Sequence, residues 1–528
     1  MNQTLPAAQW KPRSNPWIIA VVVALAAFME VLDTSIANVA LPHISGGLGA
    51  SIDQGTWVLT TYLVSNAIVL PISGWITSAI GRKRFFLICI LLFTFSSFLC
   101  GLAPSLPALL FARILQGAGG GGMQPMSQAI MADSFEPRQR PQAFALFGVT
   151  VVVAPALGPT LGGWITDNFS WRWIFFINIP VGFIAFALIY LLVEDPPFLR
   201  RFKPGEMHLD TAGLSLLVLG VGALQIFLDK GQEDDWFGSR FITTLIVVSA
   251  VSLLTLLYWE WHHRRPLIDM RLFRHANFSS ACIIMFMAGA VAFSSTVLMP
   301  QFLQTMIGYT AQDAGIIVSV GAGAVLVTLP FVAMLTAHVP AKYIIAFGWF
   351  ISAAGLYIST RLFSLHISFG VAAFIMLLQF VPVGVIFVPA TTVSYVGVPR
   401  DRSDAVAGLT NFLRNIGSSV GASIVTTILA RRSQFHLVRL SDHLGAGSFG
   451  FLSYFSETIL RLRSLGLGPS GSMAATIASI YRGFLMQATT LAYIDVYVVL
   501  GLGSAAMFFL SFLLSSNDPK ATEQHLGH

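Results

Sequence analysis

The sequence predicts an all-α membrane protein that crosses the bilayer fourteen times, and its composition and its long apolar runs are the observations that predict this. Hydrophobic residues make up 55% of the 528 positions and charged residues 10%, a balance far from that of an ordinary soluble domain. Runs of about 20 apolar residues, the length that spans a bilayer as a helix, recur along the chain. A bilayer is therefore the expected solvent.

The apolar runs fall into a block of six, an inserted pair and a second block of six. The first block comprises residues 17–41, 56–76, 85–103, 106–131, 143–165 and 173–193. The pair comprises 209–228 and 241–259, and the last block begins near Phe278, Gly315, Tyr343, Ile367, Ala405 and Thr489. This arrangement predicts two six-helix bundles separated by two inserted helices.

These blocks define the predicted domain organisation. The expected parts are an N-terminus at 1–16, a six-helix bundle at 17–193, linkers with the inserted helices at 194–275, a second bundle at 276–515 and a C-terminus at 516–528. The second bundle includes a long external connection at 431–486. An amphipathic helix is expected within it, because Phe451, Phe455, Ile459 and Leu462 follow helical spacing.

Lysine and arginine residues cluster in alternate short connections, which predicts the orientation. The clustered residues are Arg82, Lys83, Arg84, Arg138, Arg140, Arg200, Arg201, Lys203, Arg264, Arg265, Arg271, Arg274, Lys342, Arg400 and Arg402. Positive charge marks the cytoplasmic side of short loops, so both termini are expected in the cytoplasm and the protein in the inner membrane. The net charge of +6 follows from the same loops, and a nucleic-acid partner is therefore not expected.

The sequence contains few of the patterns that are typical of enzyme active sites. Cys89, Cys100 and Cys282 lie in or beside apolar runs without metal-binding spacing, so neither a disulfide nor a metal site is expected. The run 117–122 matches the dinucleotide pattern GxGxxG, but it lies inside an apolar run and follows no strand; it predicts close helix packing instead. Phosphate-loop and metalloprotease motifs are absent from the sequence, which leaves a membrane enzyme as a distant alternative and implies no cofactor.

Four charged residues lie deep inside the predicted spans: Glu30, Asp33, Arg113 and Arg414. Each costs roughly 2.5 to 3.5 kcal/mol at the middle of a bilayer, so something must offset them. Helical rise puts Asp33 and Arg113 at similar depths, which allows an ion pair, and Glu30 shares the helix face of Asp33 at i, i+3. A purely structural pair is one interpretation. Proton exchange at Asp33 is the other, because carboxylates inside a membrane usually mark ion or proton paths.

Other polar residues near span ends are given more modest interpretations. Asn411 or Asn415 could satisfy Arg414, while Asp133 and Asp495 are expected at the membrane interface. In the fifth span a set of prolines and glycines predicts a bend and a face of small residues. The members of this set are Pro155, Gly158, Pro159, Gly162 and Gly163.

Several stretches carry a resemblance to a known family. They are residues 32–42, 113–117, 154–163, 171–180, 228–231 with 235–237, and 411–421. Together they resemble the fourteen-span drug:proton antiporter branch of the major facilitator superfamily, particularly its EmrB-type multidrug exporters, over the whole chain. The resemblance implies the major facilitator fold and proton-coupled export of amphipathic drugs by alternating access, driven by the proton gradient. A fatty-acid exporter or an uptake permease on the same scaffold are alternatives.

The resemblance also implies roles for particular residues. Asp33 and Arg113 match positions linked to proton coupling, with Glu30 beside them. The residues expected around the substrate cavity are Asn38, Gln116, Asn411 and Arg414, and the fifth-span set matches the motif thought to favour export. The residues of the expected cytoplasmic gating loop are Gly74, Gly81, Arg82, Lys83 and Arg84. A periplasmic adaptor protein and an outer-membrane channel are the implied partners.

One position departs from the family pattern. Ser78 stands where the loop motif expects an aspartate, so the charge latch assigned to that aspartate is not expected here. The basic residues Arg82, Lys83 and Arg84 are kept. They are expected to contact acidic groups on the ends of neighbouring helices.

Overall fold

The computed structural model describes residues 10–199, 202, 209–263, 266–441, 449–465 and 468–514, and every element in those ranges is a helix. The first unit contains α1 (Pro16–Gly47), α2 (Ile52–Ile80), α3 (Arg82–Leu102), α4 (Leu106–Gly120), α5 (Met123–Ser134), α6 (Arg140–Asn168), α7 (Trp173–Phe176) and α8 (Asn178–Leu192). The inserted pair is α9 (Thr211–Lys230) and α10 (Arg240–His262). The second unit contains α11 (Ala276–Phe302), α12 (Ala311–Thr336), α13 (Ala341–Leu362), α14 (Phe369–Ser394), α15 (Ser403–Ser441), α16 (Phe449–Ser464) and α17 (Pro469–Leu510).

The predicted fold class is confirmed. Within the described ranges, 12 helices are long and apolar enough to cross a membrane by length and composition. Two predicted spans fall outside that set. The fourth is interrupted at Gly121 and Gly122, which separate α4 from α5, and the thirteenth corresponds to α15, which contains several polar and charged residues. The count of fourteen spans therefore stays a prediction.

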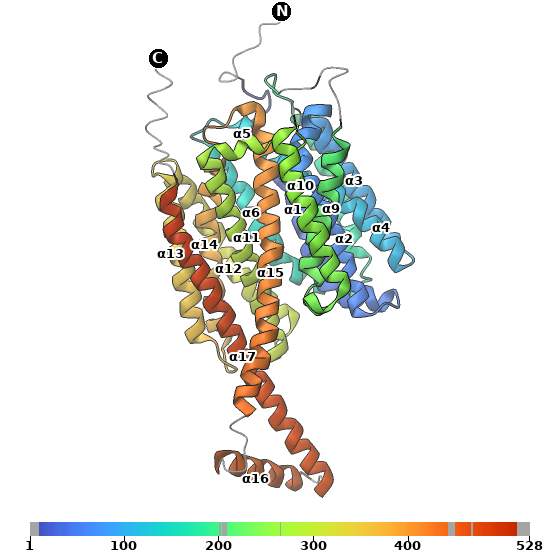
Figure 1. The fold of residues 1–528 in the computed structure, drawn as a ribbon, viewed down its shortest axis with the longest axis vertical. Helices are drawn as coiled ribbons and strands as arrows, with labels where there is room; N and C mark the ends of the chain where they lie inside the picture. The colour runs from blue at the N-terminus through green and yellow to red at the C-terminus, as the bar shows by residue number, and fades with distance from the viewer. Residues whose placement is uncertain are drawn as a thin grey trace, which may run out of the picture.

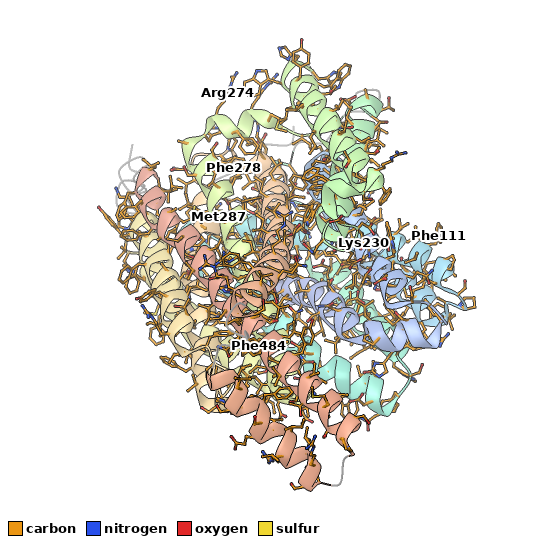
Figure 2. The ribbon with its side chains drawn as sticks, turned by 60° about the horizontal axis from the view of Figure 1, so that its bottom comes forward. Phe111, Lys230, Arg274, Phe278, Met287 and Phe484 are labelled. Carbon is orange, nitrogen blue, oxygen red and sulfur yellow. The ribbon has the colours of Figure 1, made fainter. Side chains whose placement is uncertain are left out.

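The two units meet along two seams, α2 against α15 and α6 against α12, and α5 also packs on α15 (Figure 1). Small residues allow the first seam to close: a Cβ at Gly74 would lie 3.0 Å from the Ala405 Cα. On the outward faces, large apolar side chains are exposed, as expected where lipid replaces water. Phe111, 62% exposed on the outer rim of α4, is an example (Figure 2).

The bundle has two ends, which we name after residues on α2 and α3. At the Arg82 end, α2 stops and α3 begins after Gly81, whose φ of 91° suits a residue without a Cβ. At the opposite end, the Thr56 end, α2 starts and α9 stops.

The inserted helix α9 packs against both units. At the Thr56 end its Asp229 carboxylate accepts a hydrogen bond from the Thr60 hydroxyl of α2, and Lys230 Nζ lies 3.3 Å from the Asp53 carbonyl oxygen (Figure 2). Gln225 Nε2 donates to the Ser419 hydroxyl of α15 at 2.8 Å. The inserted pair is therefore attached at the α2–α15 seam.

Residues 431–486, expected as a long connection, are largely helical in the described parts. At about 1.5 Å per residue, α15 is about 58 Å long and α17 about 63 Å, while a bilayer core is about 30 Å thick. Both helices extend beyond the rest of the bundle at the Thr56 end, with α16 across their tips (Figure 1). We call this part the helical extension.

The expected amphipathic helix is confirmed as α16, where Phe455 and Ile459 are half-buried beside exposed neighbours. The helix that contains the last predicted span begins about 20 residues before Thr489, because α17 begins at Pro469. Apolar composition predicts the part of a helix that lies inside lipid. It does not predict whether the helix continues into water. Asp495 bonds to Arg432 and His436 of α15, which holds α15 and α17 together.

Candidate functional site

An ion pair lies at the centre of the first unit. Arg113 Nη1 of α4 lies 2.7 Å from Asp33 Oδ2 of α1, and neither side chain is more than 1% exposed. Gln116, one turn after Arg113, donates from Nε2 to Asp33 Oδ1 at 3.0 Å and accepts from Arg113 Nη1 at 2.8 Å. The predicted pair is therefore direct, and Gln116 bridges its two members.

The rest of the Arg113 guanidinium is enclosed by the first unit. Its Nε donates to the Val58 carbonyl oxygen of α2 at 3.1 Å, and the Tyr62 ring lies under it at 4.4 Å. Nη2 is buried without a partner among the described residues. A buried guanidinium with an unused donor can bind a further acceptor, such as a water molecule or a migrating carboxylate.

Asn178 completes the cluster, and the sequence analysis did not single it out. Its Nδ2 donates to Asp33 Oδ1 at 2.6 Å and to the Ser97 hydroxyl at 3.0 Å. The signal available in the sequence is a lone amide inside the apolar stretch 171–180. Asp33 thus accepts from Arg113, Gln116 and Asn178, an arrangement suited to an ionised carboxylate.

Glu30 has a separate set of partners, although it lies one turn from Asp33. Tyr62 Oη donates to its Oε1 at 3.0 Å, Asn66 Nδ2 to the same oxygen at 3.1 Å, and Gln124 Nε2 to its Oε2 at 2.5 Å. Tyr62 therefore touches both sites, through its hydroxyl at Glu30 and its ring at Arg113. Gln124, which follows the break between α4 and α5, was not predicted.

The α15 residues face this second site. Arg414 Nη2 donates to Gln124 Oε1, and its guanidinium lies 5.7 Å from the centre of the Phe387 ring of α14. The expectation that Asn411 or Asn415 satisfies Arg414 is wrong. Asn411 donates to Gln128 Oε1 of α5 at 2.7 Å, and Asn415 donates to Asn66 Oδ1 at 3.3 Å. Each of these side chains links the second unit to the first.

The proline and glycine set of α6 packs on α1 directly after Asp33. Pro159 has no N–H to give to the Pro155 carbonyl one turn earlier, and the Ser35 hydroxyl of α1 donates to that oxygen instead at 3.0 Å. Gly158 lies against Ser35 and Gly162 against Ile36. The part of α6 that contains the two prolines is therefore packed against the helix that carries both acids.

Replacing Gly158 with alanine is expected to destabilise the protein by about 1 to 3 kcal/mol, the usual cost of overpacking. The new Cβ would lie 2.1 Å from Ser35 Oγ and 2.4 Å from Ser35 Cβ, so α6 must move. Thermal unfolding in detergent measures the loss. Gly163→Ala is the matched control, because its Cβ would meet no described atom within 4 Å, and an equal loss in both variants would contradict the packing argument.

A charge cluster closes the Arg82 end. Arg82 Nη1 lies 2.7 Å from Asp133 Oδ2 of α5, and Arg82 Nε lies 2.7 Å from Asp404 Oδ1 of α15. The three side chains are at most 5% exposed, and Ser403 Oγ also donates to Asp133 Oδ1 at 2.9 Å. Asp133, expected at the membrane interface, is thus buried between helices at this end of the bundle. This Arg82 cluster ties α15 to the first unit.

The other residues of the predicted gating loop are distributed differently. The Ser78 hydroxyl donates to the Gly74 carbonyl oxygen of its own helix. Position 78 therefore supplies no carboxylate, and Asp404 of α15 is a carboxylate partner of Arg82 instead. Lys83 Nζ donates to the Tyr190 carbonyl oxygen at 2.6 Å, whereas Arg84 is exposed. Among the three basic residues, Arg82 is the one with carboxylate partners between the two units.

Asn38, expected near a cavity, lies apart from both acids. Its side chain is exposed on α1, beyond the turn that carries Ser35. Cys89, Cys100 and Cys282 are free and buried. Cys100 Sγ lies 3.4 Å from Gln116 Oε1, at the edge of the Asp33 cluster.

Comparison with known sequences gives a consistent assignment. Residues 23–422 match the family model described as Major Facilitator Superfamily. The chain is 37% identical over 489 residues to the multidrug export protein EmrB of Haemophilus influenzae, covering 92% of this chain and 94% of that protein. It is 36% identical over 498 residues to EmrB of Escherichia coli strain K12, covering 93% of this chain and 95% of that protein. The fatty acid resistance protein FarB of Neisseria gonorrhoeae is 37% identical over 427 residues, covering 81% and 83%.

Solved structures share the fold at low identity. The human organic anion transporter MFSD10 superposes with a TM-score of 0.58 at 12% identity, covering 91% of this chain and 100% of that chain. The proton:xylose symporter XylE superposes with a TM-score of 0.57 at 12% identity, covering 96% and 97%. At this identity the likeness extends to the architecture alone.

Proposed function

The chain belongs to the major facilitator superfamily, and on this premise we propose that it is a proton-coupled antiporter that exports amphipathic drugs or other toxic small molecules. The observation that carries the proposal is the buried Asp33–Arg113 pair. A structural pair alone would be satisfied by two charges. Here Asp33 also has amide donors from Gln116 and Asn178. In addition, Tyr62 contacts Arg113 through its ring and bonds through its hydroxyl to a second buried acid, Glu30.

The proposed coupling uses exchange of the Asp33 partners. With Asp33 ionised, Arg113 and the amides hold α1, α4 and α8 together. A proton on Asp33 neutralises the carboxylate, and Arg113 then loses its counter-charge while its side chain is fully buried. The unused Nη2 of Arg113 gives the guanidinium a donor for another partner in the protonated state. Proton binding thereby changes which arrangement of the two units is favoured.

The available driving force is sufficient for this task. One proton crossing 100 mV supplies about 2.3 kcal/mol, and one pH unit supplies about 1.4 kcal/mol. Each 1.4 kcal/mol corresponds to a tenfold concentration ratio. One exchanged proton therefore holds a neutral solute at a gradient of a few hundredfold. ATP and a bound cofactor have no part in this scheme.

We assign the Arg82 end to the cytoplasm of a cell with an inner membrane, with both termini on that side, because the short connections there carry most of the basic residues. In this orientation the helical extension projects into the periplasm. We propose that a periplasmic adaptor and an outer-membrane channel complete the export path. The extension supplies a surface clear of the bilayer, with Phe435, Tyr454 and Leu460 exposed.

Fatty acids are the second candidate substrate class, because FarB is as similar in identity as the EmrB proteins. Both classes are amphiphiles, and a transporter selects between them through cavity side chains rather than through its coupling residues. The family resemblance weighs against a membrane enzyme, since the relatives named here are transport or resistance proteins.

The test is a panel of amphipathic drugs and long-chain fatty acids in an efflux-deficient host that expresses the chain, with and without a protonophore uncoupler. Expected is resistance to at least one class, with intracellular accumulation that rises when the uncoupler is added. An Arg84→Gln variant, changed at an exposed residue in the first turn of α3, serves as a control and should protect as well as the wild type. Absence of resistance, or resistance that the uncoupler leaves unchanged, would overturn the proposal.

A further inference from the structure

Glu30 is a buried carboxylate whose hydrogen-bond donors, among the residues that the structure describes, are all neutral. Its side chain is 4% exposed, and it accepts from the Tyr62 hydroxyl and from the amides of Asn66 and Gln124. An ionised carboxylate only accepts, so these donors suit the charged form. A buried charge with neutral donors alone is costly in a membrane, and a positive charge is therefore expected nearby.

That charge is Arg414, and it reaches Glu30 through the Gln124 amide. Gln124 Nε2 donates to Glu30 Oε2 at 2.5 Å, while its Oε1 accepts from Arg414 Nη2. Turning the amide over would set its oxygen against the carboxylate and its NH₂ against the guanidinium, so the charges at both ends fix its orientation. Gln124 is thus a neutral bridge between two opposite charges.

The bridge crosses the boundary between the two units. Glu30 and Gln124 belong to α1 and α5, whereas Arg414 belongs to α15. One residue further along α15, Asn415 Nδ2 donates to Asn66 Oδ1, and Asn66 is itself a donor to Glu30. Two hydrogen bonds from α15 therefore end on side chains that bind Glu30 directly.

We propose that Gln124 and Arg414 are positioning residues that make Glu30 a second proton-responsive site, one that controls the contact of α15 with the first unit. The proposal rests on the proposed proton-coupled function. A proton bound by the Glu30 carboxylate converts it to a neutral acid, whose new O–H donor competes with Gln124 Nε2 for the same space. The amide then loses its fixed orientation and Arg414 loses its counter-charge. The contact of α15 with the first unit at Gln124 is therefore weakened.

Glu30 and Asp33 differ in what they hold. Asp33 and its donors lie within the first unit, on α1, α4 and α8, whereas the Glu30 bridge connects the two units. The ionisable groups around Glu30 are Tyr62 of α2, Arg414 of α15, Asp33 one turn along α1, and Arg113 of α4 on the ring of Tyr62. Arg414 is the one on the second unit, which makes it the residue to test.

The experiment measures the distance between the units in the full chain, reconstituted in lipid nanodiscs, from acid to alkaline pH. Spin labels are placed on Asn168→Cys of the first unit and Ser364→Cys of the second, both exposed, and the three native cysteines are buried. Expected is a pH-dependent change of the distance distribution in the wild type. Glu30→Gln should lose at least half of the change and stay nearer the acid distribution at alkaline pH, because the response of Asp33 remains, and Arg414→Gln should lose a similar share.

Rescue and control variants separate positioning from folding. Arg414→Lys keeps the charge and should keep most of the pH response, whereas Gln124→Leu removes the bridge and should resemble Arg414→Gln. Arg432→Gln, another arginine of α15 but bonded within the second unit, should respond like the wild type. An Arg414→Gln variant with the full wild-type response would overturn the inference.

Proton-driven export by the same variants, measured in proteoliposomes, distinguishes this failure from failure of the proposed function. If proton-driven export is present in the wild type and Arg414→Gln keeps the full pH response, the inference about Arg414 is wrong and the exporter proposal stands. If the wild type shows no proton-driven export at all, the proposed function itself has failed.

Discussion

Replacing Asp33 with asparagine is expected to abolish uphill export, so that a substrate gradient of a few hundredfold in proteoliposomes falls to about one. Asparagine keeps the size of the side chain and can still accept from Gln116 and Asn178, but it cannot bind and release a proton. The measurement is substrate accumulation driven by an imposed pH difference of about one unit together with a membrane potential of about 100 mV. Exchange of labelled for unlabelled substrate, which needs no net proton movement, should continue and shows that the carrier is folded.

A structural role for the pair predicts a different pattern. Removing one partner of a buried ion pair costs about 3 to 5 kcal/mol, because the other charge is left unpaired. Asp33→Asn should therefore also lower the unfolding temperature, and the double variant Asp33→Asn with Arg113→Gln should recover much of that loss. If recovered stability brings recovered proton-driven export, the pair is structural and the coupling role of Asp33 is wrong. We expect stability to return while export does not.

The Asp33 cluster shows how far the sequence could lead. Helical rise alone put Asp33 and Arg113 at one depth, and their charge made a pairing necessary in lipid. Depth, however, is a single coordinate. Depth could not show that Glu30 has partners different from those of Asp33, because the two acids share a face on α1. Glu30 is contacted from α2 and α5, whereas Asp33 is contacted from α4 and α8.

Uncharged polar residues were harder to predict than charged ones. Asn178, Gln124 and Gln128 each lie in a mainly apolar stretch, where a single amide is cheaper than a charge and so less conspicuous. Their partners come from other helices, up to 290 positions away for Gln124 and Arg414. Assigning those partners requires knowing which helix faces which, and that information lies in the packing of small residues such as Gly74 against α15.

The Arg82 cluster illustrates the same limit. From the sequence, Arg82 was expected to contact acidic groups on neighbouring helices. The family motif would supply one such aspartate at position 78, but this chain has Ser78 there. The structure supplies Asp404, which lies more than 300 positions later in the first turn of α15. An acidic residue in the first turn of a helix is ordinarily explained by the helix dipole, so Asp404 gave no sign of a longer-range role.

Replacing Arg82 with glutamine is expected to open the Arg82 end of the bundle. The change leaves Asp133 and Asp404 buried on facing helices without their shared cation, a loss of about 3 to 5 kcal/mol. Water can solvate the two carboxylates and weaken the repulsion between them. Water enters this site if α15 separates from α2 and α5. The variant should therefore favour the state in which this end is open.

Labelling of a cysteine at Thr77 measures the opening. Thr77 is buried on α2 beside Asp404, and a water-soluble maleimide should react with Thr77→Cys at least about tenfold faster when Arg82→Gln is present, as expected for a shift of about 1.4 kcal/mol or more. Arg84→Gln, which removes an exposed arginine two positions away, is the matched control and should leave the rate unchanged. Adding Asp404→Asn to Arg82→Gln removes one of the opposed charges and should slow the reaction again. Equal rates in the Arg82 and Arg84 variants would mean that packing at Gly74 and Ala405, rather than charge, keeps this end closed.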